Sequence, residues 1–316
     1  MGKNVWLVGA GCMALEYIKV LKKLDIEFLV IGRSETSARI CDENSGVSTL
    51  TGGLEFFLAQ KPKICNYAIV SVGADALADV TMKLLRYGVK NILVEKPAGL
   101  SFFEIEQVKH LTDIQQAHVF VGYNRRFYSS VLHAQKLIDE DGGVTSFNFE
   151  FTELSDRIAG LECENSIKRK WFLGNSTHVV DLAFYVGGKP REISCYSAGS
   201  MCWHPSASVF SGAGITEKGA LFSYNANWDS AGRWSVELLT KRNRYIFRPL
   251  EKLQVQKRGE FSTDLIEIDD YLDVEFKPGL FRQVDHFISG NTNHLCTISE
   301  QFDKLPLYNK IANYCD

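Results

Sequence analysis

The sequence predicts two domains of different class: an N-terminal α/β domain with a parallel sheet, and a C-terminal α+β domain with a large, mainly antiparallel, open sheet. Its 316 residues are enough for two domains of about 150 residues each. Up to residue 122, short apolar runs alternate with stretches of helical periodicity. Beyond it, apolar and polar residues alternate over longer runs, as in strands with one buried face. We therefore expect domains at 1–122 and 123–316, with the last helix able to pack back on the first domain.

The first third of the chain reads as strand and helix in alternation. Continuous apolar runs indicate strands buried on both faces, as in a parallel sheet covered by helices. Between them, Ser101 and Glu104 have the spacing of a capping box at the start of a helix. The five predicted strands are Val5–Val8, Phe28–Ile31, Ala68–Val72, Asn91–Val94 and Val119–Gly122.

The C-terminal part has the period of two-faced strands. From Phe222 to Trp228, aromatic or small apolar residues alternate with Ser and Asn. Trp234–Thr240 and Tyr245–Arg248 are predicted to pair as a hairpin, and we interpret the basic turn between them as solvated charge. The stretch Ser211–Gly214 is predicted to form a hairpin or a bulge.

Composition narrows the function classes. Lys plus Arg number 35 and Asp plus Glu 38, a formal net charge of −3, so binding to nucleic acid through phosphate neutralisation is not expected. No apolar run has the length of a membrane span. A strand begins at Val5, which leaves no room for a signal peptide, and the eight cysteines include no C-x-x-C pair. We expect a cytoplasmic protein with reduced thiols, no membrane partner and no metal site.

A glycine-rich loop follows the first predicted strand. Gly9, Gly11 and Ala14 fit the pattern G-x-G-x-x-A between a strand and a helix. The first glycine permits a tight turn, the second lets a pyrophosphate approach the backbone, and the small Ala14 allows helix and strand to pack closely. The helix N-terminus offers free N–H groups to phosphate oxygens. This context predicts a Rossmann dinucleotide-binding domain.

The end of the second strand bears on cofactor choice. NAD-selective domains usually place Asp or Glu there to bind the ribose 2′-hydroxyl. Here Gly32 stands in that place, followed by Arg33 and Ser34. A guanidinium can stack on adenine and pair with a 2′-phosphate, and a hydroxyl adds a hydrogen bond. We predict NADP(H), while Glu35 keeps NAD(H) possible.

Two further stretches support a family resemblance. Leu93-Val94-Glu95-Lys96-Pro97 ends a predicted strand, and Val121-Gly122-Tyr123-Asn124-Arg125-Arg126-Phe127 closes the first domain. With the glycine loop, their order and spacing resemble the glucose–fructose oxidoreductase, inositol dehydrogenase and rhizopine-catabolism family (Gfo/Idh/MocA) over roughly the first 130 residues. The resemblance implies an NAD(P)-dependent oxidoreductase that acts on carbohydrate-like substrates.

The resemblance also implies residue roles. Lys96 would bond the substrate hydroxyl and help to move its proton, with Glu95 and Pro97 positioning it, the proline through a strained or cis peptide. On a later helix, His178 would be the acid–base, oriented by Asp181. The expected cofactor contacts are Gly9, Gly11, Cys12, Met13, Arg33, Ser34, Ser71, Gly73, Glu95, Lys96, Pro97 and Asn124.

The chain departs from the family pattern near the predicted acid–base. Where the family has Asp four residues before the histidine, this chain has Gly174, with Asn175 beside it. An amide can hold a hydroxyl but cannot relay a proton. Trp171-Phe172 stands where the family often has Trp-Arg, and Ser71–Leu77 replaces a P-x-x-x-H pattern.

The leading hypothesis is an oxidoreductase that moves a hydride between nicotinamide and a hydroxyl or keto carbon of a sugar, polyol or nucleotide-linked sugar. Lys168–Lys170 could attract an anionic group such as a diphosphate, or be a solvated charge run. The resemblance implies a homodimer or homotetramer through the C-terminal sheet. The expected substrate contacts are Lys96, Asn124, Arg169, Trp171, Asn175 and His178.

Two alternatives stay open. One keeps the cofactor and reduces a C=N or conjugated system, where the missing relay acid would matter less. The other is a dinucleotide-binding sensor or scaffold with little turnover. Gly174 favours the sensor, whereas Lys96 and His178 favour an enzyme.

Overall fold

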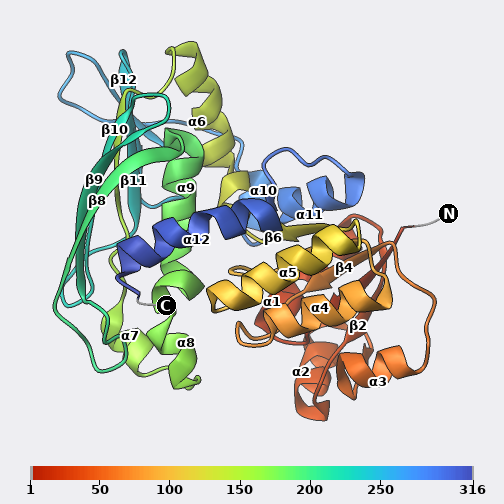
Figure 1. Ribbon diagram of the computed structural model, residues 1–316. Helices are drawn as coiled ribbons and strands as arrows, with labels where there is room; N and C mark the ends of the chain where they lie inside the picture. Colours follow the sequence, from red (N-terminus) through yellow and green to blue (C-terminus); the bar gives the residue numbers. More distant parts are fainter. Residues whose placement is uncertain (1–2, 315–316) are drawn as a thin grey trace. The chain divides into compact units, whose positions relative to one another are not determined.

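The computed structural model describes residues 3–314, which divide into two compact units (Figure 1). Unit 1 contains the chain up to Asn124 together with Val274–Leu305. Unit 2 contains Arg125–Asp273 and the chain from Pro306 on. The division after Asn124 lies two residues beyond the boundary expected from the sequence. The return of the chain to unit 1 starts well before the last helix, because β15 and α11 complete the first sheet and its helical cover.

Unit 1 is built on the predicted parallel sheet. The described residues form seven strands in the order β15-β6-β5-β4-β1-β2-β3, all parallel except β15. All five predicted strands are confirmed, each end within two residues. β3 and β15 were not predicted, since two residues give no periodicity to detect. The strands are β1 (Asn4–Val8), β2 (Glu27–Ile31), β3 (Thr49–Leu50), β4 (Tyr67–Val70), β5 (Asn91–Val94), β6 (His118–Val121) and β15 (Cys296–Thr297).

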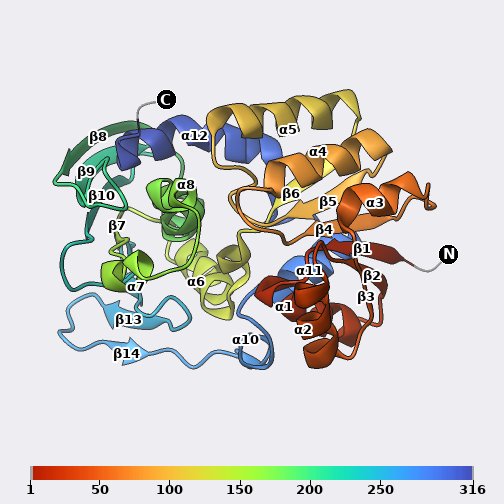
Figure 2. The ribbon, with the colours of Figure 1, turned by 90° about the horizontal axis from the view of Figure 1, so that it is seen from below.

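Helices cover both faces of this sheet. Figure 2 shows α3, α4 and α5 over one face and α1, α2 and α11 over the other. The predicted capping box is confirmed, because Ser101 accepts from Glu104 N and Glu104 accepts from Ser101 N. The helices are α1 (Cys12–Lys23), α2 (Glu35–Ser45), α3 (Gly53–Ala59), α4 (Leu77–Tyr87), α5 (Phe102–Ile114) and α11 (Leu280–Ser289), and α12 (Ile298–Ala312) runs from unit 1 into unit 2.

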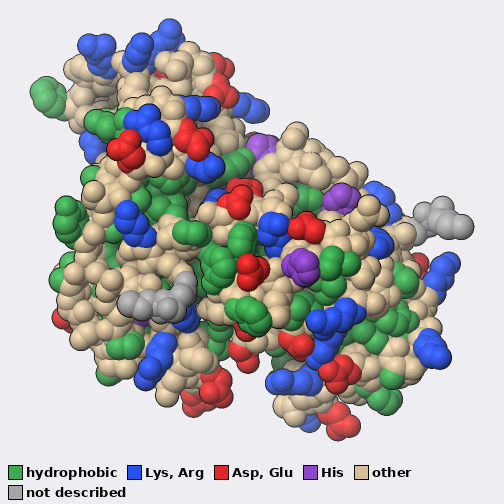
Figure 3. All heavy atoms as spheres, in the orientation of Figure 1, with side chains coloured by type: hydrophobic (Ala, Val, Ile, Leu, Met, Phe, Trp, Pro, Cys, Tyr) green, Lys and Arg blue, Asp and Glu red, His purple; other side chains and the backbone are tan. Residues whose placement is uncertain are grey.

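Unit 2 contains the predicted open sheet. Its strand order is β14-β13-β12-β11-β7-β10-β9-β8, with every pair antiparallel except β7 and β10. The predicted hairpin is confirmed as β11 and β12. Basic side chains gather at the end of the sheet near β12 (Figure 3). The strands are β7 (Ser146–Glu150), β8 (Pro190–Ala198), β9 (Val209–Thr216), β10 (Leu221–Asn227), β11 (Ser235–Leu239), β12 (Asn243–Phe247), β13 (Gln254–Lys257) and β14 (Asp264–Leu265).

The core of unit 2 lies between this sheet and α9. Phe147 and Phe149 of β7 meet Phe184 of α9 edge to face, with ring centroids 5.9 and 5.5 Å apart. Within residues 3–314, no helix combines the length and apolar composition needed to cross a membrane. The helices here are α6 (Ser129–Glu140), α7 (Ser155–Ala159), α8 (Asn165–Arg169), α9 (Thr177–Gly187) and α10 (Tyr271–Glu275), with a 3-10 turn at Asn124–Phe127 and a π-helical turn at Phe172–Ser176.

One predicted turn is wrong. Ser211–Gly214 lies inside β9, where it pairs with both β8 and β10. The glycines are needed for packing, because a Cβ on Gly212 would lie 2.5 Å from the ring of Tyr224. The local sequence pattern indicates a turn because the aromatic side chains that need this space are on the neighbouring strand.

Candidate functional site

The glycine loop (Gly9–Ala14) leads from β1 into α1, as predicted. Gly9 has φ +123°, and a Cβ there would lie 2.5 Å from the carbonyl oxygen of Ser71. Ser71 follows β4 and donates from its backbone N–H to Val8 O at 2.8 Å. Only glycine therefore fits where the ends of β1 and β4 approach each other.

The N-terminus of α1 is open to a ligand. Gly11 is the N-cap residue, no side chain caps the helix, and a Cβ on Gly11 would meet nothing within 4 Å. Cys12 is exposed and Met13 half-buried in the first turn, while Ala14 is buried. Free N–H groups with space before them suit the phosphates of a dinucleotide.

A side chain at the end of β2 would be crowded by its neighbours. Gly32 is buried, and a Cβ on it would lie 2.9 Å from Thr49 Cγ2. The next residue, Arg33, is exposed. Ser34 is the N-cap of α2: its hydroxyl accepts from Ser37 N at 3.2 Å and lies 2.7 Å from the Ser37 hydroxyl. This edge therefore offers a guanidinium, two hydroxyls and a helix N-terminus.

Glu95, directly after β5, is held by a hydrogen bond from another element of unit 1. Tyr17 of α1 donates its hydroxyl to Glu95 Oε1 at 2.7 Å. Burial raises the pKa of Glu95, while the Tyr17 hydrogen bond and the nearby Lys96 and Lys277 act in the opposite direction. Burial and the Glu95 carboxylate raise the pKa of Tyr17 well above its usual value. The side chain before Lys96 is thus held in one orientation.

The Lys96–Pro97 peptide bond is held by Gln301, which is itself bound by Tyr123. Lys96–Pro97 is cis, one of the two conformations expected, and Lys96 is half-buried. Gln301 of α12 donates to Pro97 O at 3.0 Å and accepts from the Tyr123 hydroxyl at 3.1 Å. Sequence reasoning missed Gln301 and Tyr17, because nothing near them in the chain marks a contact with residues 95–97.

The remaining predicted residues of unit 1 are placed less uniformly. Gly73 is exposed in the loop after β4. Asn124 is buried, and its amide nitrogen donates to Pro278 O at 2.8 Å. Adjacent parallel strands end together, so Gly9, Gly32, Ser71 and Glu95 share the carboxyl edge of the sheet, where α/β folds bind ligands.

In unit 2, α9 carries the predicted acid–base. His178 and Asp181 are both buried, and the His178 ring centroid lies 6.3 Å from that of Trp234. Arg126 donates to both carboxylate oxygens of Asp181, at 2.8 and 2.7 Å, and stacks on the ring of Tyr185 at 4.6 Å. Asp181 therefore balances a buried guanidinium, and its orienting role toward His178 stays a prediction.

The π-helical turn (Phe172–Ser176) contains a carboxylate contact that sequence reasoning missed. Glu153, three residues after β7, is only 4% exposed. Asn175 Nδ2 donates to its two oxygens at 3.1 and 3.0 Å, and Ser176 Oγ donates at 2.6 Å. Burial raises the pKa of Glu153, while Ser176, Trp171, Asn175 and Arg233 act in the opposite direction.

The same turn is held at its start by the end of the chain. Phe172 N donates to the Tyr314 hydroxyl at 3.2 Å, and that hydroxyl lies 2.9 Å from His204 Nε2. Burial lowers the pKa of His204. The ring of Tyr314 lies 4.4 Å from Lys170 Nζ. A residue far away in the sequence thus fixes the first residue of the turn.

The basic run before the turn divides into three environments. Lys168 is buried and donates to Ala159 O at 2.9 Å, and Lys170 covers the Tyr314 ring. Arg169 is exposed, and Trp171 is half-buried. Of the three cations, Arg169 is therefore the one open to an anionic ligand.

Comparison with known proteins agrees with the N-terminal site. Residues 3–123 match the model of an oxidoreductase family with an NAD-binding Rossmann fold, Gfo/Idh/MocA. This confirms the resemblance inferred from the glycine loop and the Glu95–Pro97 segment, and with it the expected class of NAD(P)-dependent oxidoreductase. A search of curated proteins found no significant match.

Solved structures share the fold over nearly the whole chain. The WlbA dehydrogenase of Bordetella pertussis, in complex with NADH and UDP-GlcNAcA, has a TM-score of 0.77 at 14% identity and covers 99% of this chain and 96% of its own. Levoglucosan dehydrogenase in complex with NADH has a TM-score of 0.79 at 14% identity and covers 99% of this chain and 96% of its own. UDP-N-acetylglucosamine 3-dehydrogenase GnnA of Acidithiobacillus ferrooxidans has a TM-score of 0.76 at 11% identity and covers 98% of this chain and 97% of its own. At these identities the likeness shows the fold alone.

Proposed function

Because residues 3–123 match the Gfo/Idh/MocA oxidoreductases, we propose that this protein is an NADP(H)-dependent oxidoreductase of a sugar, polyol or nucleotide-linked sugar. The observation that carries the proposal is the shared sheet edge of unit 1, where the glycine loop and the anchored Glu95–Pro97 segment lie at the ends of adjacent strands. Glycine loops occur in many nucleotide-binding proteins, so support for an oxidoreductase comes from the Glu95–Pro97 segment, which lies within the matched residues 3–123.

Support for NADP(H) comes from the end of β2. Gly32 has no side chain to bind a free 2′-hydroxyl, and a Cβ there would crowd Thr49 Cγ2. Arg33, Ser34, Ser37 and the N-terminus of α2 supply positive charge and donors for a 2′-phosphate instead. The Bordetella and levoglucosan enzymes were solved with NADH, so this selectivity is a property proposed for this chain and not carried over from them.

In the proposed reaction, the nicotinamide supplies or accepts the hydride, and the protein orients the substrate and handles its proton. Lys96 would donate to the reacting oxygen from a backbone held by Gln301. His178, on α9, would exchange the proton with solvent or substrate. Removal of a correctly placed acid–base typically lowers turnover by about 10²- to 10⁴-fold.

The substrate class follows from the neighbours and the remaining predicted contacts. The structural neighbours include UDP-N-acetylglucosamine 3-dehydrogenase, levoglucosan dehydrogenase and the WlbA dehydrogenase in complex with UDP-GlcNAcA. In this chain Asn124, Trp171 and Asn175 offer amide groups and an aromatic ring, which suit the polar edges and apolar faces of a sugar. Arg169 is the exposed cation that would meet a diphosphate.

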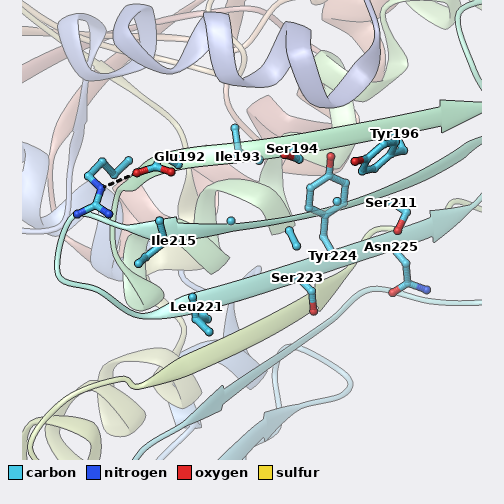
Figure 4. Close-up of a pocket in the computed structure, with 14 residues that line it drawn as sticks. Glu192, Ile193, Ser194, Tyr196, Ser211, Ile215, Leu221, Ser223, Tyr224 and Asn225 are labelled. Carbon is cyan, nitrogen blue, oxygen red and sulfur yellow. Dashed lines mark hydrogen bonds and ion pairs between the residues drawn. The ribbon is translucent and has the colours of Figure 1, made fainter.

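We also propose that the protein is a homodimer or homotetramer through the outer face of the second sheet. The strand register gives β8, β9 and β10 twelve outward positions, and Glu192 is the single charged residue among them. It is paired at 3.2 Å with Arg191, which lies at the register shift of β8 and also lines this face. Figure 4 shows Tyr196, Ser194, Ser211 and Leu221 around a hollow of about 910 Å³ on this face. A surface depleted of charge is typical of an interface core. The cytoplasmic location expected from the sequence stays a prediction.

One observation favours the sensor alternative. Gly174 is half-buried, and a Cβ there would meet nothing within 4 Å. The chain therefore has space for a side chain at this position but no carboxylate, as a protein with little turnover would. Reduction of a C=N or conjugated system, the other alternative, would need no relay acid there.

The first test is a fluorescence titration of NADPH and NADH on wild type and Arg33→Ala. We expect NADPH to bind more tightly, and the variant to lose about 10- to 100-fold in NADPH affinity, 1.4–2.8 kcal/mol, with little change for NADH. Arg39→Ala, which changes an exposed arginine in the second turn of α2, is the control. Selective binding of NADH would overturn the NADP proposal.

The second test measures turnover. Wild type, Lys96→Ala and His178→Ala are mixed with NADP⁺ and a panel of UDP-sugars, hexoses and polyols, and absorbance of the reduced cofactor is followed. The proposal expects wild-type activity on at least one compound and its loss in both variants, with NADPH affinity retained. NADPH binding without turnover of any compound, including imines in the reverse direction, would favour the sensor.

A further inference from the structure

We infer that Glu153 is a positioning residue: its buried carboxylate fixes the Asn175 amide so that Asn175 Oδ1 is presented to a hydroxyl or N–H donor of the substrate. This inference rests on the oxidoreductase function proposed above. It adds Glu153, three residues after β7, to the site. It also specifies that the site recognises a hydrogen-bond donor of the substrate.

The geometry of the carboxylate sets the orientation of the amide. An ionised carboxylate has only acceptor oxygens, so Asn175 must turn its NH₂ group toward Glu153. The two donor–acceptor distances, 3.1 and 3.0 Å, show the nitrogen shared between both oxygens. Ser176 Oγ, at 2.6 Å, takes another acceptor position on the same group. Arg125 and Arg233 are the cations whose charges act on this carboxylate.

The other end of the amide is left as an acceptor. In a planar amide, Oδ1 lies on the opposite side of Cγ from Nδ2, away from Glu153. Within residues 3–314 no hydrogen bond reaches Asn175 Oδ1, and the side chain is half-buried. An acceptor that is fixed in direction and reachable from solvent suits recognition of a donor group.

The location of this amide ties it to the proposed chemistry. Asn175 and Ser176 are consecutive residues of the π-helical turn, and such turns are frequent at functional sites. Both side chains reach one carboxylate, while Tyr314 binds Phe172 N at the other end of the turn. His178 follows within the next helical turn. Glu153 therefore sets the geometry of the segment that leads into the predicted acid–base.

The experiment uses the compound that wild type oxidises best in the panel above. Glu153→Gln keeps the shape of the side chain and replaces one acceptor by a donor, so the Asn175 amide loses its single allowed orientation. We expect KM to rise about tenfold or more, with kcat changed by less than about threefold. In an Asn175→Ala background, Glu153→Gln should raise KM no further, because the two residues act through one contact.

Glu150→Gln is the matched control. Glu150, the last residue of β7, is a half-buried carboxylate that accepts from Arg233 N at 3.1 Å. It should leave KM unchanged. If Glu153→Gln does not fold, Asn175→Leu keeps the carboxylate and removes the acceptor, and its KM must rise by the same factor. Unchanged KM in either folded variant, or additive effects in the double variant, would overturn the inference.

A second readout separates this inference from the proposed function. If wild type oxidises no compound of the panel, spectra of protein labelled with ¹⁵N-asparagine still report on the amide. The side-chain NH₂ signals of Asn175, assigned by their loss in Asn175→Asp, should move in Glu153→Gln and stay in place in Glu150→Gln. Signals that do not move in Glu153→Gln would rule out the contact itself.

Discussion

The glycine loop of unit 1 and the π-helical turn of unit 2 position their groups in opposite ways. In the loop, the functional groups are backbone N–H groups, and the residues that expose them lie within a few positions of one another. In the turn, the candidate functional groups are side chains. Asn175 binds Glu153, 22 residues away in sequence, and the backbone N–H of Phe172 binds Tyr314, 142 residues away. A backbone site depends on which residues are small, whereas a side-chain site depends on what the rest of the fold brings against it.

The largest effect on stability is expected at the buried ion pair of Arg126 and Asp181 in unit 2. Asp181→Asn leaves Arg126, 2% exposed, without its full counter-charge, and we expect a loss of about 3–5 kcal/mol in the free energy of unfolding. Urea unfolding measures this. Lys252→Met removes one side of an exposed ion pair with Asp270 and should cost less than about 1 kcal/mol. If the two substitutions lower the free energy of unfolding equally, Asp181 does not balance the charge of Arg126.

Two substitutions in the glycine loop should separate the effect on stability from the effect on NADPH binding. Gly9→Ala forces a Cβ against Ser71 O at positive φ and should cost about 1–3 kcal/mol of stability together with most NADPH affinity. Gly11→Ala meets no protein atom within 4 Å, so Tm should stay constant while NADPH affinity falls about tenfold. Calorimetry and fluorescence titration on both variants test this. A fall in Tm for Gly11→Ala would show that its space serves the fold.

The distant contact at the π-helical turn is tested by Tyr314→Phe. Phe172 N and His204 Nε2 both lose the hydroxyl, and an unsatisfied buried polar group costs about 1–3 kcal/mol. Tyr87→Phe is the control in unit 1, because that hydroxyl makes a single bond, to Pro62 O at 2.6 Å. Thermal unfolding should show the larger loss for Tyr314→Phe. The comparison of the two sites fails if both variants behave alike.

The smallest effect is a difference in pH dependence. Burial raises the pKa of Glu153 above its usual 4.5, so the folded protein holds this proton more tightly than the unfolded chain. The contribution of Glu153 protonation to the stability of the folded protein is therefore complete below pH 4.5 and is lost as pH rises through the pKa of Glu153 in the folded state. Relative to Glu153→Gln, the Tm of wild type should decline over this interval. A wild-type Tm that rises relative to the variant would mean that the hydrogen bonds to Glu153 outweigh its burial.

Much of unit 1 was predictable because its signals are local. The five strands are continuous apolar runs, the capping box is a four-residue pattern, and the Glu95–Pro97 segment directly follows a strand. In unit 2 the alternation of β10 and the hairpin of β11 and β12 were equally local and were predicted. Ser211–Gly214 was predicted wrongly because Tyr224 and Phe222, on the next strand, occupy the space that its glycines leave.

The sequence by itself determined the class of both sheets, the glycine loop and the absence of an acid at the end of β2, and through the family resemblance it made Lys96 and His178 candidates. These depend on residue type, spacing and short-range periodicity. Only the tertiary structure decided that Gln301 and Tyr17 hold the Lys96 segment, that Arg126 occupies the Asp181 carboxylate and that Glu153 orients Asn175. Each of these is a contact between residues of separate elements, and a hydrogen bond of about 3 Å depends on how those elements pack, which no local pattern encodes.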